Sequence, residues 1–425
     1  MKPRILFVGI IDSPHTARWI ELIADQGWDL HFFPVYPAAP HPIMRGITIH
    51  RPWIPFQSKG IFRRLVSSYF SKSKNKDKNT LPIRSIYPIP VTPKYEHKLL
   101  GIRTKPLGES NITTQAAYGP RVLARLIKKL KPDLIHSMEF QHAGYTVLKA
   151  KEEIHRKYFP KWLATNWGSD IYYFKNFPDH EKQITRLLQA IDYYSCECHR
   201  DIKLAQGLGL VTKDPFLLTN TGGFDLEKIS TLRNEIKPSS RNIIMIKGYQ
   251  HFAGRALTAL EALIGCIEHV KNYHIIVYSA SVEIFARIEE IKSLYQLNIT
   301  TYTPLQLSHD EMLVLFSKAR IYLGVSISDA ISTSMLEAMA MGTFPIQTNT
   351  ACCDEWIEDG KTGFSIPPDN VSHITNCLNK ALLDDALVDT AALLNWTTVS
   401  ERLDKNIIRE KEVAIYHKIF EEIGT

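Results

Sequence analysis

The chain has 425 residues, of which 44% are hydrophobic and 22% charged, and this balance excludes a disordered or collagen-like protein and predicts at least two folded domains. Its formal net charge is +7, but residues 1–210 carry 32 Lys and Arg against 17 Asp and Glu, whereas residues 211–425 carry 19 against 27. The first half is therefore basic and the second acidic. This asymmetry suggests that the first half faces an anionic partner.

Six cysteines fit neither a disulfide framework nor the paired spacing of a zinc finger, so we expect the reducing cytoplasm. We interpret Cys196-Glu197-Cys198-His199 as thiols on a buried strand, because a tetrahedral zinc ion needs a second ligand pair at suitable spacing. We expect no signal peptide after Met1. No apolar run approaches the roughly 20 residues that span a bilayer, so any membrane association is expected to be peripheral.

In chain order, an apolar strand at residues 5–8 leads to a helix that Ser13 caps and Pro14 begins. A helix at 123–130, with lysines in its last turn, precedes a strand at 134–136. Further strands are expected at 162–165 and 193–196. This alternation is typical of βαβ units.

Residues 58–118 interrupt the alternation as a basic insertion, and 17 basic residues lie between Lys59 and Lys131. Its first part has an apolar face of Phe62, Leu65, Val66, Tyr69 and Phe70 among lysines and arginines. That pattern favours contact of residues 58–131 with an anionic membrane surface. A solvated loop is the alternative, and nucleic acid is not expected as a partner.

Residues 209–241 have the composition of a connection between domains, and beyond them strands are expected at 243–246, 274–278 and 321–325. Ser308 and Glu311 form a capping box for a further helix. We therefore predict an α/β protein with two Rossmann-like doubly wound domains facing a cleft. Their ranges are 1–220 and 221–398, and a helix at 399–425 crosses back to the first domain.

The most informative stretch runs from Ser328 to Gly342, where a small-residue loop follows a strand and opens a helix near Ser334. The amides at such a helix start can hold phosphate oxygens. Asp329 and Glu337 bracket it and are suited to accept hydrogen bonds from sugar hydroxyls. The alternative is that Ser334 and Glu337 only form a capping box, which needs no ligand.

This stretch resembles the signature of retaining glycosyltransferase family 4, which has the GT-B fold: two acidic residues separated by seven precede Ala-Met-Ala-x-Gly. The resemblance covers most of residues 1–380 in order. It also includes Cys353 to Phe364, Gly168-Ser169-Asp170, Asn220 with Gly222-Gly223-Phe224-Asp225, and Leu307 to Glu311.

The resemblance implies a site in the second domain. Glu337 would accept from the nucleotide ribose, and Asp329, where the family usually has Glu, would hold the donor sugar. Lys247 and Arg255 would neutralise the departing diphosphate, with their order reversed relative to the family. Further donor-binding residues would be Ser332, Thr333, Ser334, Met335, Leu336 and Gly248.

The family also carries a functional histidine in the first domain, where this chain has Met138. His142, brought into place by a one-residue insertion, is the favoured candidate, and His136 is the other. His15 is a candidate for the acceptor side of the cleft.

We therefore expect a metal-independent, retaining hexosyltransferase whose substrate is a nucleoside diphosphate sugar, with no cofactor. Its acceptor would be a glycan or a lipid-linked molecule in cell-surface polysaccharide or glycolipid synthesis, at the inner face of the membrane. The alternatives are a GT-B sugar-nucleotide 2-epimerase, a catalytically silent sugar-nucleotide or membrane-binding relative, and a transferase acting on nucleic acid.

Overall fold

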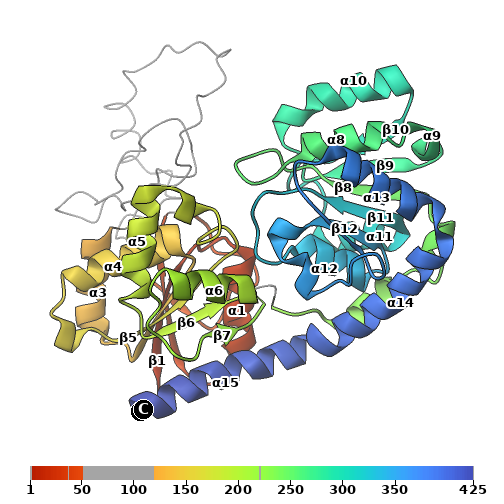
Figure 1. Cartoon of the computed structure of the whole chain (residues 1–425). Coiled ribbons are helices and arrows are strands. Elements are labelled where there is room, and N and C mark those ends of the chain that lie inside the picture. Colours follow the sequence, from red (N-terminus) through yellow and green to blue (C-terminus); the bar gives the residue numbers. More distant parts are fainter. Residues whose placement is uncertain (1, 37, 51–118, 220–221, 425) are drawn as a thin grey trace, which may run out of the picture.

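The fold is given by a computed structural model that describes residues 2–36, 38–50, 119–219 and 222–424. These residues form two α/β domains side by side (Figure 1). The expected basic insertion at 58–118 lies outside the described residues, as does Asn220.

The first domain is built on a parallel sheet whose central strands are almost entirely buried. In the described part of the chain its strands are β1 (Arg4–Gly9), β2 (Asp29–Pro34), β3 (Thr48–Ile49), β4 (Leu134–Met138), β5 (Lys161–Thr165), β6 (Tyr193–Cys196) and β7 (Phe216–Leu217). They pair in the order β3-β2-β1-β4-β5-β6-β7. Ile5 pairs with Leu30 on one side and Leu134 on the other. Such burial is expected where helices cover both faces of a parallel sheet.

The described helices of the first domain follow the strands. They are α1 (Pro14–Ile23), α3 (Pro120–Leu130), α4 (Tyr145–Glu152), α5 (Pro178–Leu188) and α6 (His199–Gly207), with a π-helix, η1 (Phe140–Gly144), and the short 3₁₀ helices η2 (Arg156–Tyr158) and η3 (Phe174–Asn176). The start of α1 is as predicted, because the Ser13 hydroxyl accepts from the Thr16 amide at 3.4 Å and Pro14 is the first helical residue.

The second domain repeats this design. Its described strands are β8 (Ile243–Lys247), β9 (His274–Tyr278), β10 (Asn298–Thr301), β11 (Ala319–Gly324), β12 (Phe344–Thr348) and β13 (Phe364–Ile366). They pair in parallel in the order β10-β9-β8-β11-β12-β13. The two-domain Rossmann-like fold is therefore confirmed.

Helices pack on both faces of this second sheet (Figure 1). The described helices before and within the domain are α7 (Leu226–Leu232), α8 (Ala256–Ile264), α9 (Ile267–Val270), α10 (Phe285–Tyr295), α11 (His309–Lys318), α12 (Thr333–Ala340) and α13 (Val371–Leu383), with η4 (Pro238–Ser240), η5 (Val282–Ile284), η6 (Asn349–Ala351) and η7 (Cys353–Glu355). The predicted capping box of Ser308 and Glu311 is present at the start of α11.

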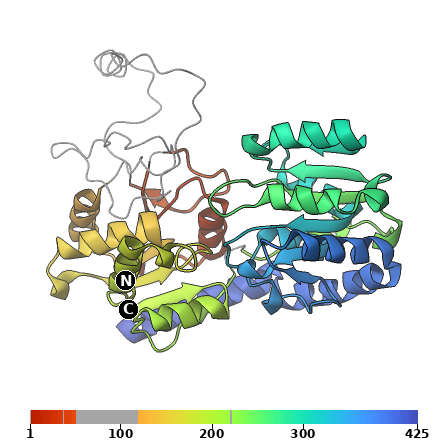
Figure 2. The ribbon, with the colours of Figure 1, turned by 45° about the horizontal axis from the view of Figure 1, so that its top comes forward.

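The chain ends in two helices, α14 (Asp385–Arg402) and α15 (Lys405–Ile423). The predicted helix from residue 399 is thus divided at Leu403, whose carbonyl accepts from the Phe224 amide at 2.6 Å, and Asp404 caps α15. As predicted, α15 returns to the first domain, and both ends of the chain lie there (Figure 2). Tyr416 and Phe420 of α15 pack in the same apolar cluster as Trp19 of α1.

The strand order marks the place where each sheet has a crevice. In each sheet the order reverses at one point, between β1 and β4 in the first and between β8 and β11 in the second. The loops at the carboxyl ends of the strands diverge there and leave a crevice. Because the two domains face each other, the loops after these four strands line one space between them.

Among the described residues, no helix combines the length and the apolar character that crossing a membrane requires.

The hydroxyl of Tyr416 is predicted to be important for stability. It accepts from Trp19 Nε1 at 2.9 Å and lies 2.7 Å from His136 Nδ1, all within the core. Tyr416→Phe leaves two buried polar groups without this partner, so the free energy of unfolding should fall by about 1–3 kcal/mol. Urea unfolding followed by tryptophan fluorescence measures this. Tyr158→Phe is the control, since Tyr158 is 71% exposed, and equal losses in both variants would contradict the prediction.

Candidate active site

A cavity of about 530 Å³ lies between the two domains, at the facing edges of their sheets. The first domain contributes the loops after β1, β4 and β5, and the second contributes those after β8, β9 and β11. The lining residues are Ile10, Pro14, His15, Arg18, Glu139, His142, Trp167, Gly168, Ser169, Asp170, Phe174, Glu197, Lys247, Tyr249, Phe252, Tyr278, Ser279, Met312, Asp329, Ile331, Thr333, Ser334 and Glu337.

Two carboxylates and one ammonium group line the second-domain wall, and the sequence predicted all three. Glu337 is only 2% exposed, and its Oε1 lies 2.7 Å from Nε2 of His309. Asp329 precedes α12, and its Oδ1 accepts from the Ala330 amide at 2.9 Å. Lys247 is the last residue of β8, which is the neighbour of β11 in the sheet, and this loop follows β11. The histidine partner of Glu337 was not predicted, although it stands at the start of the helix that the capping box identified.

The structure decides between the two interpretations of the start of α12. Ser332 is the N-cap, and its hydroxyl accepts from the Met335 amide at 3.4 Å. The alternative capping box of Ser334 and Glu337 is wrong, because the Glu337 carboxylate bonds to His309 instead. Ser334 and Thr333 therefore face the cavity, where the first amides of the helix have no intrahelical acceptor.

Lys247 stays protonated in this environment. Burial lowers its pKa, but the negative charges of Asp329 and Glu337, with the neighbouring Tyr322 and Tyr249, favour the ammonium form and raise the pKa overall. The side chain is a fixed positive charge within a wall that also carries two carboxylates. Such a charge is suited to stabilise negative charge on a bound group.

On the first-domain wall, His142 lies in η1, and its Nδ1 is 3.3 Å from Oε2 of Glu139. Glu139 also accepts from the amides of His142 and Ala143, the latter at 2.6 Å. Its φ of 76° is rare for a residue with a side chain. Glu139 thus orients the predicted histidine, and its position directly after β4 was the signal that could have identified it.

His15 lines the cavity as predicted, with its ring 5.6 Å from that of Trp167. Arg18 lines it too and was missed. The signal was the helical spacing from Pro14 and His15, which places Arg18 on the same face of α1. The first domain therefore adds a cation to the cavity.

Other candidates lie outside the cavity. Arg255 donates through Nη1 to the carbonyls of His251 at 2.9 Å and Gly254 at 2.8 Å, so it stabilises its own loop. The side chains of Met335 and Leu336 are buried in the core. Gly248 is required by packing, because a Cβ there would lie 2.7 Å from Cα of Ala280.

His136 is also outside the cavity. It is fully buried, and its Nε2 lies 2.7 Å from the Thr165 hydroxyl. Burial lowers its pKa to about 3. In this structure the ring connects β4, β5 and α15 and contacts no substrate-accessible space.

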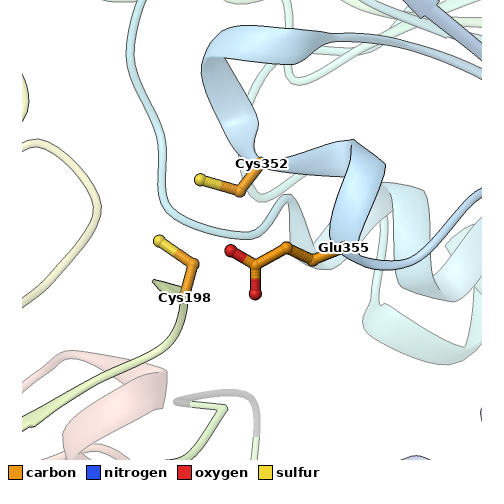
Figure 3. Close-up of side chains that lie close together, drawn as sticks. All are labelled: Cys198, Cys352 and Glu355. Carbon is orange, nitrogen blue, oxygen red and sulfur yellow. The ribbon is translucent and has the colours of Figure 1, made fainter. Parts of the chain in front are cut away.

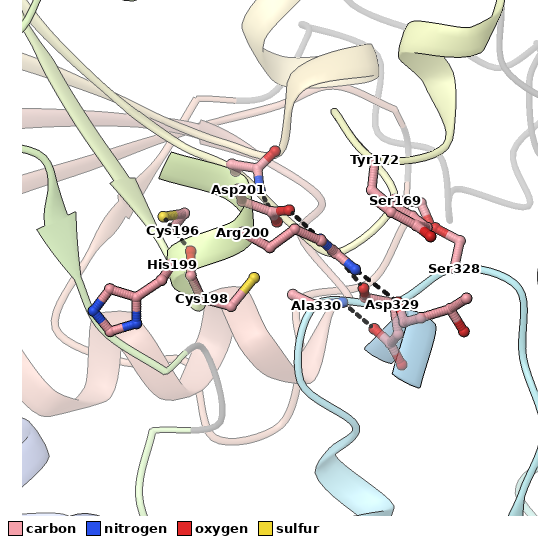
Figure 4. Close-up of polar contacts among 12 residues, drawn as sticks. Ser169, Tyr172, Cys196, Cys198, His199, Arg200, Asp201, Ser328, Asp329 and Ala330 are labelled. Carbon is pink, nitrogen blue, oxygen red and sulfur yellow. Dashed lines mark hydrogen bonds and ion pairs between the residues drawn. The ribbon is translucent and has the colours of Figure 1, made fainter. Parts of the chain in front are cut away.

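The two domains meet beside the cavity at the loop 328–330 (Figure 4). A Cβ on Gly168 would lie 2.2 Å from the Ala330 nitrogen, so only glycine permits this approach. Arg200 of α6 donates from Nη2 to the Asp329 carbonyl and from Nη1 to the Thr350 carbonyl, both at 2.7 Å. The loop that carries Asp329 is therefore held by residues of the first domain.

Comparison with protein families gives two matches. Residues 260–392 match the model described as "Glycosyl transferases group 1", and residues 90–196 match "Glycosyl transferase 4-like". The chain is a GT-B glycosyltransferase. The family model of the second domain contains α12 with Asp329 and Glu337, and the chemistry of the enzyme is glycosyl transfer from a nucleotide sugar. No curated protein sequence matches the chain significantly.

Solved structures agree with this fold. Sucrose-phosphate synthase from Thermosynechococcus elongatus is 15% identical, with a TM-score of 0.66 over 99% of this chain and 100% of that one. HepE of Anabaena, in complex with UDP and glucose, is 14% identical, with a TM-score of 0.62 over 97% and 99%. A TarM mutant of S. aureus, in complex with fondaparinux, α-GlcNAc-glycerol and UDP, is 11% identical, with a TM-score of 0.64 over 98% and 100%.

The buried His136 predicts a pH dependence of stability. The folded chain does not protonate it above a pKa of about 3, whereas the unfolded chain does so below about 6.5. The unfolded state therefore binds more protons in this window, and the contribution of His136 to stability falls as the pH falls, by up to about 1.4 kcal/mol per pH unit. Urea unfolding at several pH values, compared with His136→Gln, isolates this contribution. Parallel profiles of the two proteins would contradict the assignment.

Proposed function

We propose that this enzyme transfers a sugar from a nucleoside diphosphate sugar to an acceptor with retention of configuration at the anomeric carbon. One observation carries the proposal. Asp329, Glu337 and Lys247 share one cavity wall with the start of α12, opposite His142 and Glu139. Hydroxyl acceptors, a phosphate-binding helix start and a cation are the groups that a nucleotide sugar requires.

In this proposal residues 221–398 bind the donor. The diphosphate lies at the amides of Thr333 and Ser334, where the helix dipole favours negative charge. Glu337 accepts hydrogen bonds from the ribose hydroxyls, and His309 orients it at 2.7 Å. Asp329 accepts from hydroxyls of the transferred sugar.

The proposed reaction needs no protein nucleophile. The bond between the anomeric carbon and the diphosphate oxygen breaks, while the acceptor hydroxyl attacks from the same face and gives its proton to the departing phosphate. Lys247 stabilises the charge that develops on the leaving group. Arg18 adds positive charge to the cavity from the first domain, in the role that the sequence assigned to Arg255. These cations support a reaction without a metal ion.

Residues 1–220 bind the acceptor in this proposal. His15 and Trp167 line that side, and His142 lies where the acceptor and the donor sugar meet. The proposed acceptor is a glycan or a lipid-linked molecule in cell-surface polysaccharide or glycolipid synthesis. UDP is the nucleotide in the HepE and TarM complexes, so uridine donors are the first to test.

The donor site is tested with Glu337→Ala. A screen of UDP-, GDP- and ADP-sugars by thermal shift and donor hydrolysis selects the donor for the wild type. Because Glu337 is the only carboxylate proposed for the ribose, its loss should reduce turnover by at least about 100-fold with unchanged circular dichroism. Glu268→Ala is the control, since the Glu268 side chain is 73% exposed and far from the cavity wall.

The products discriminate between the alternatives. A glycoside whose anomeric configuration matches the donor, determined by NMR, supports the proposal. An inverted glycoside contradicts retention. Free nucleoside diphosphate with a 2-epimeric sugar indicates an epimerase, and donor binding without any product indicates a silent relative. Full activity of Glu337→Ala would overturn the site assignment.

We also propose that the enzyme works at the inner face of the membrane, supported by the excess of 32 basic over 17 acidic residues in positions 1–210. It should sediment with vesicles that contain anionic phospholipid and not with phosphatidylcholine vesicles. Alanine at Lys72, Lys74, Lys76 and Lys78 should weaken binding by about 1 kcal/mol per lysine. The control has alanine at Lys271, Lys292, Lys318 and Lys361. Equal binding to both kinds of vesicle would contradict the proposal.

A further inference from the structure

Two cysteines and a carboxylate from the two domains lie close together (Figure 3). Cys198 is the N-cap of α6 in the first domain, and Cys352 and Glu355 belong to the turns after β12 in the second. One ligand atom of each residue lies within 4.8 Å of the other two. No other group of this kind is found among the described residues.

The cluster combines two buried thiols with an ionisable carboxylate. Both thiols are buried, with Cys198 0% and Cys352 3% exposed, yet the Glu355 side chain, 20% exposed, turns its carboxylate toward the two sulfurs (Figure 3). Both thiols belong to a buried apolar cluster, and an ionised carboxylate is costly in such an environment unless it has partners. Cys352 has a φ of 45°, which is rare for a residue with a side chain.

The carboxylate is held in its position from outside. Glu355 Oε1 accepts from the His199 amide at 2.8 Å, and Oε2 lies 3.0 Å from His199 Nδ1. A carboxylate has about four lone pairs, so both oxygens can still bind another group. Ligands that a neighbouring group orients in this way are typical of protein metal sites.

The spacing fits a tetrahedral ion. Zinc binds thiolate sulfur at about 2.3 Å and carboxylate oxygen at about 2.0–2.2 Å, so ligand atoms in a tetrahedral site lie about 3.5–3.8 Å apart. A cluster within 4.8 Å needs only a small contraction to reach this geometry. Two thiolates and a carboxylate carry more negative charge than one divalent ion neutralises. Arg200, which interacts electrostatically with both thiols, offsets the excess.

We propose that Cys198, Cys352 and Glu355 bind one zinc-like divalent metal ion, with a water molecule in the fourth position, and that this ion joins the two domains. Binding releases the two thiol protons. The site is separate from the donor cavity, so it does not depend on the proposed function. The site is connected to the active-site loop through Arg200. This residue follows His199 in the chain and donates to the carbonyls of Asp329 and Thr350 (Figure 4).

Cobalt is the probe, because a tetrahedral Co²⁺ ion with thiolate ligands absorbs strongly in the visible and near ultraviolet. The full chain, purified with reductant and stripped with a chelator, is titrated with Co²⁺ and then with Zn²⁺. We expect one Co²⁺ per chain with a thiolate charge-transfer band, which Zn²⁺ abolishes. Zn²⁺ should also raise the melting temperature of the wild type.

Variants separate the ligands from other thiols. Cys198→Ser and Cys352→Ser should lose the charge-transfer band or halve its intensity, and Glu355→Gln should weaken Co²⁺ binding by about 10–100-fold. Cys266→Ser is the matched control, because Cys266 is also buried but lies outside the cluster. Its spectrum should equal that of the wild type.

Two results would overturn the proposal. One is a wild type that binds no Co²⁺ with thiolate bands, which requires no variant to fold. The other is a disulfide between Cys198 and Cys352, found by mass spectrometry in the protein as purified without added oxidant. In that case the two thiols would form a covalent crosslink instead of a metal site.

Discussion

The contact between the loop 328–330 and the first domain is the constraint on which the active site depends. The backbone of this loop lies so close to Gly168 that a side chain there would clash with Ala330. Arg200 reaches across from α6 and donates to the Asp329 carbonyl at 2.7 Å. Because two domains with separate cores share this contact, the cavity between them has a defined shape, and Asp329 is positioned by both.

The two walls of the cavity carry charged groups with different roles. Lys247 lies among Asp329, Glu337 and two tyrosines, which raise its pKa despite burial. Asp170, in the first-domain wall, has its pKa raised by burial and by the charge of Glu139. It accepts from the amides of Phe140 and Trp167 at 2.9 and 2.7 Å, and so connects the loops after β4 and β5. Positive charge faces the place that we propose for the diphosphate, and the carboxylates of Glu139 and Asp170 organise the opposite wall.

Sequence reasoning found the candidate site best where function and local structure coincide. Asp329, Glu337, Thr333 and Ser334 were identified from one strand, loop and helix, since a helix start exposes its amides whatever the rest of the fold does. Histidines were harder to assign. His136 points into the core from β4 and is buried, whereas His142 lies within a π-helix that no periodicity predicts. Arg255 was chosen for its charge, but its guanidinium bonds to its own loop.

The sequence by itself determined the two blocks of alternating strands and helices, the capped starts of α1 and α11, and the acidic pair of the second domain. These are consequences of neighbouring residues, through apolar periodicity and capping hydrogen bonds. Only the tertiary structure decided that Tyr416 of α15 packs in the core of the first domain and that Arg18 and Glu139 line the cavity. It also decided that Cys198 lies next to Cys352 and Glu355, although 156 positions of the chain separate Glu355 from His199. Such contacts depend on how the two sheets are placed against each other, and no local pattern along the chain encodes that placement.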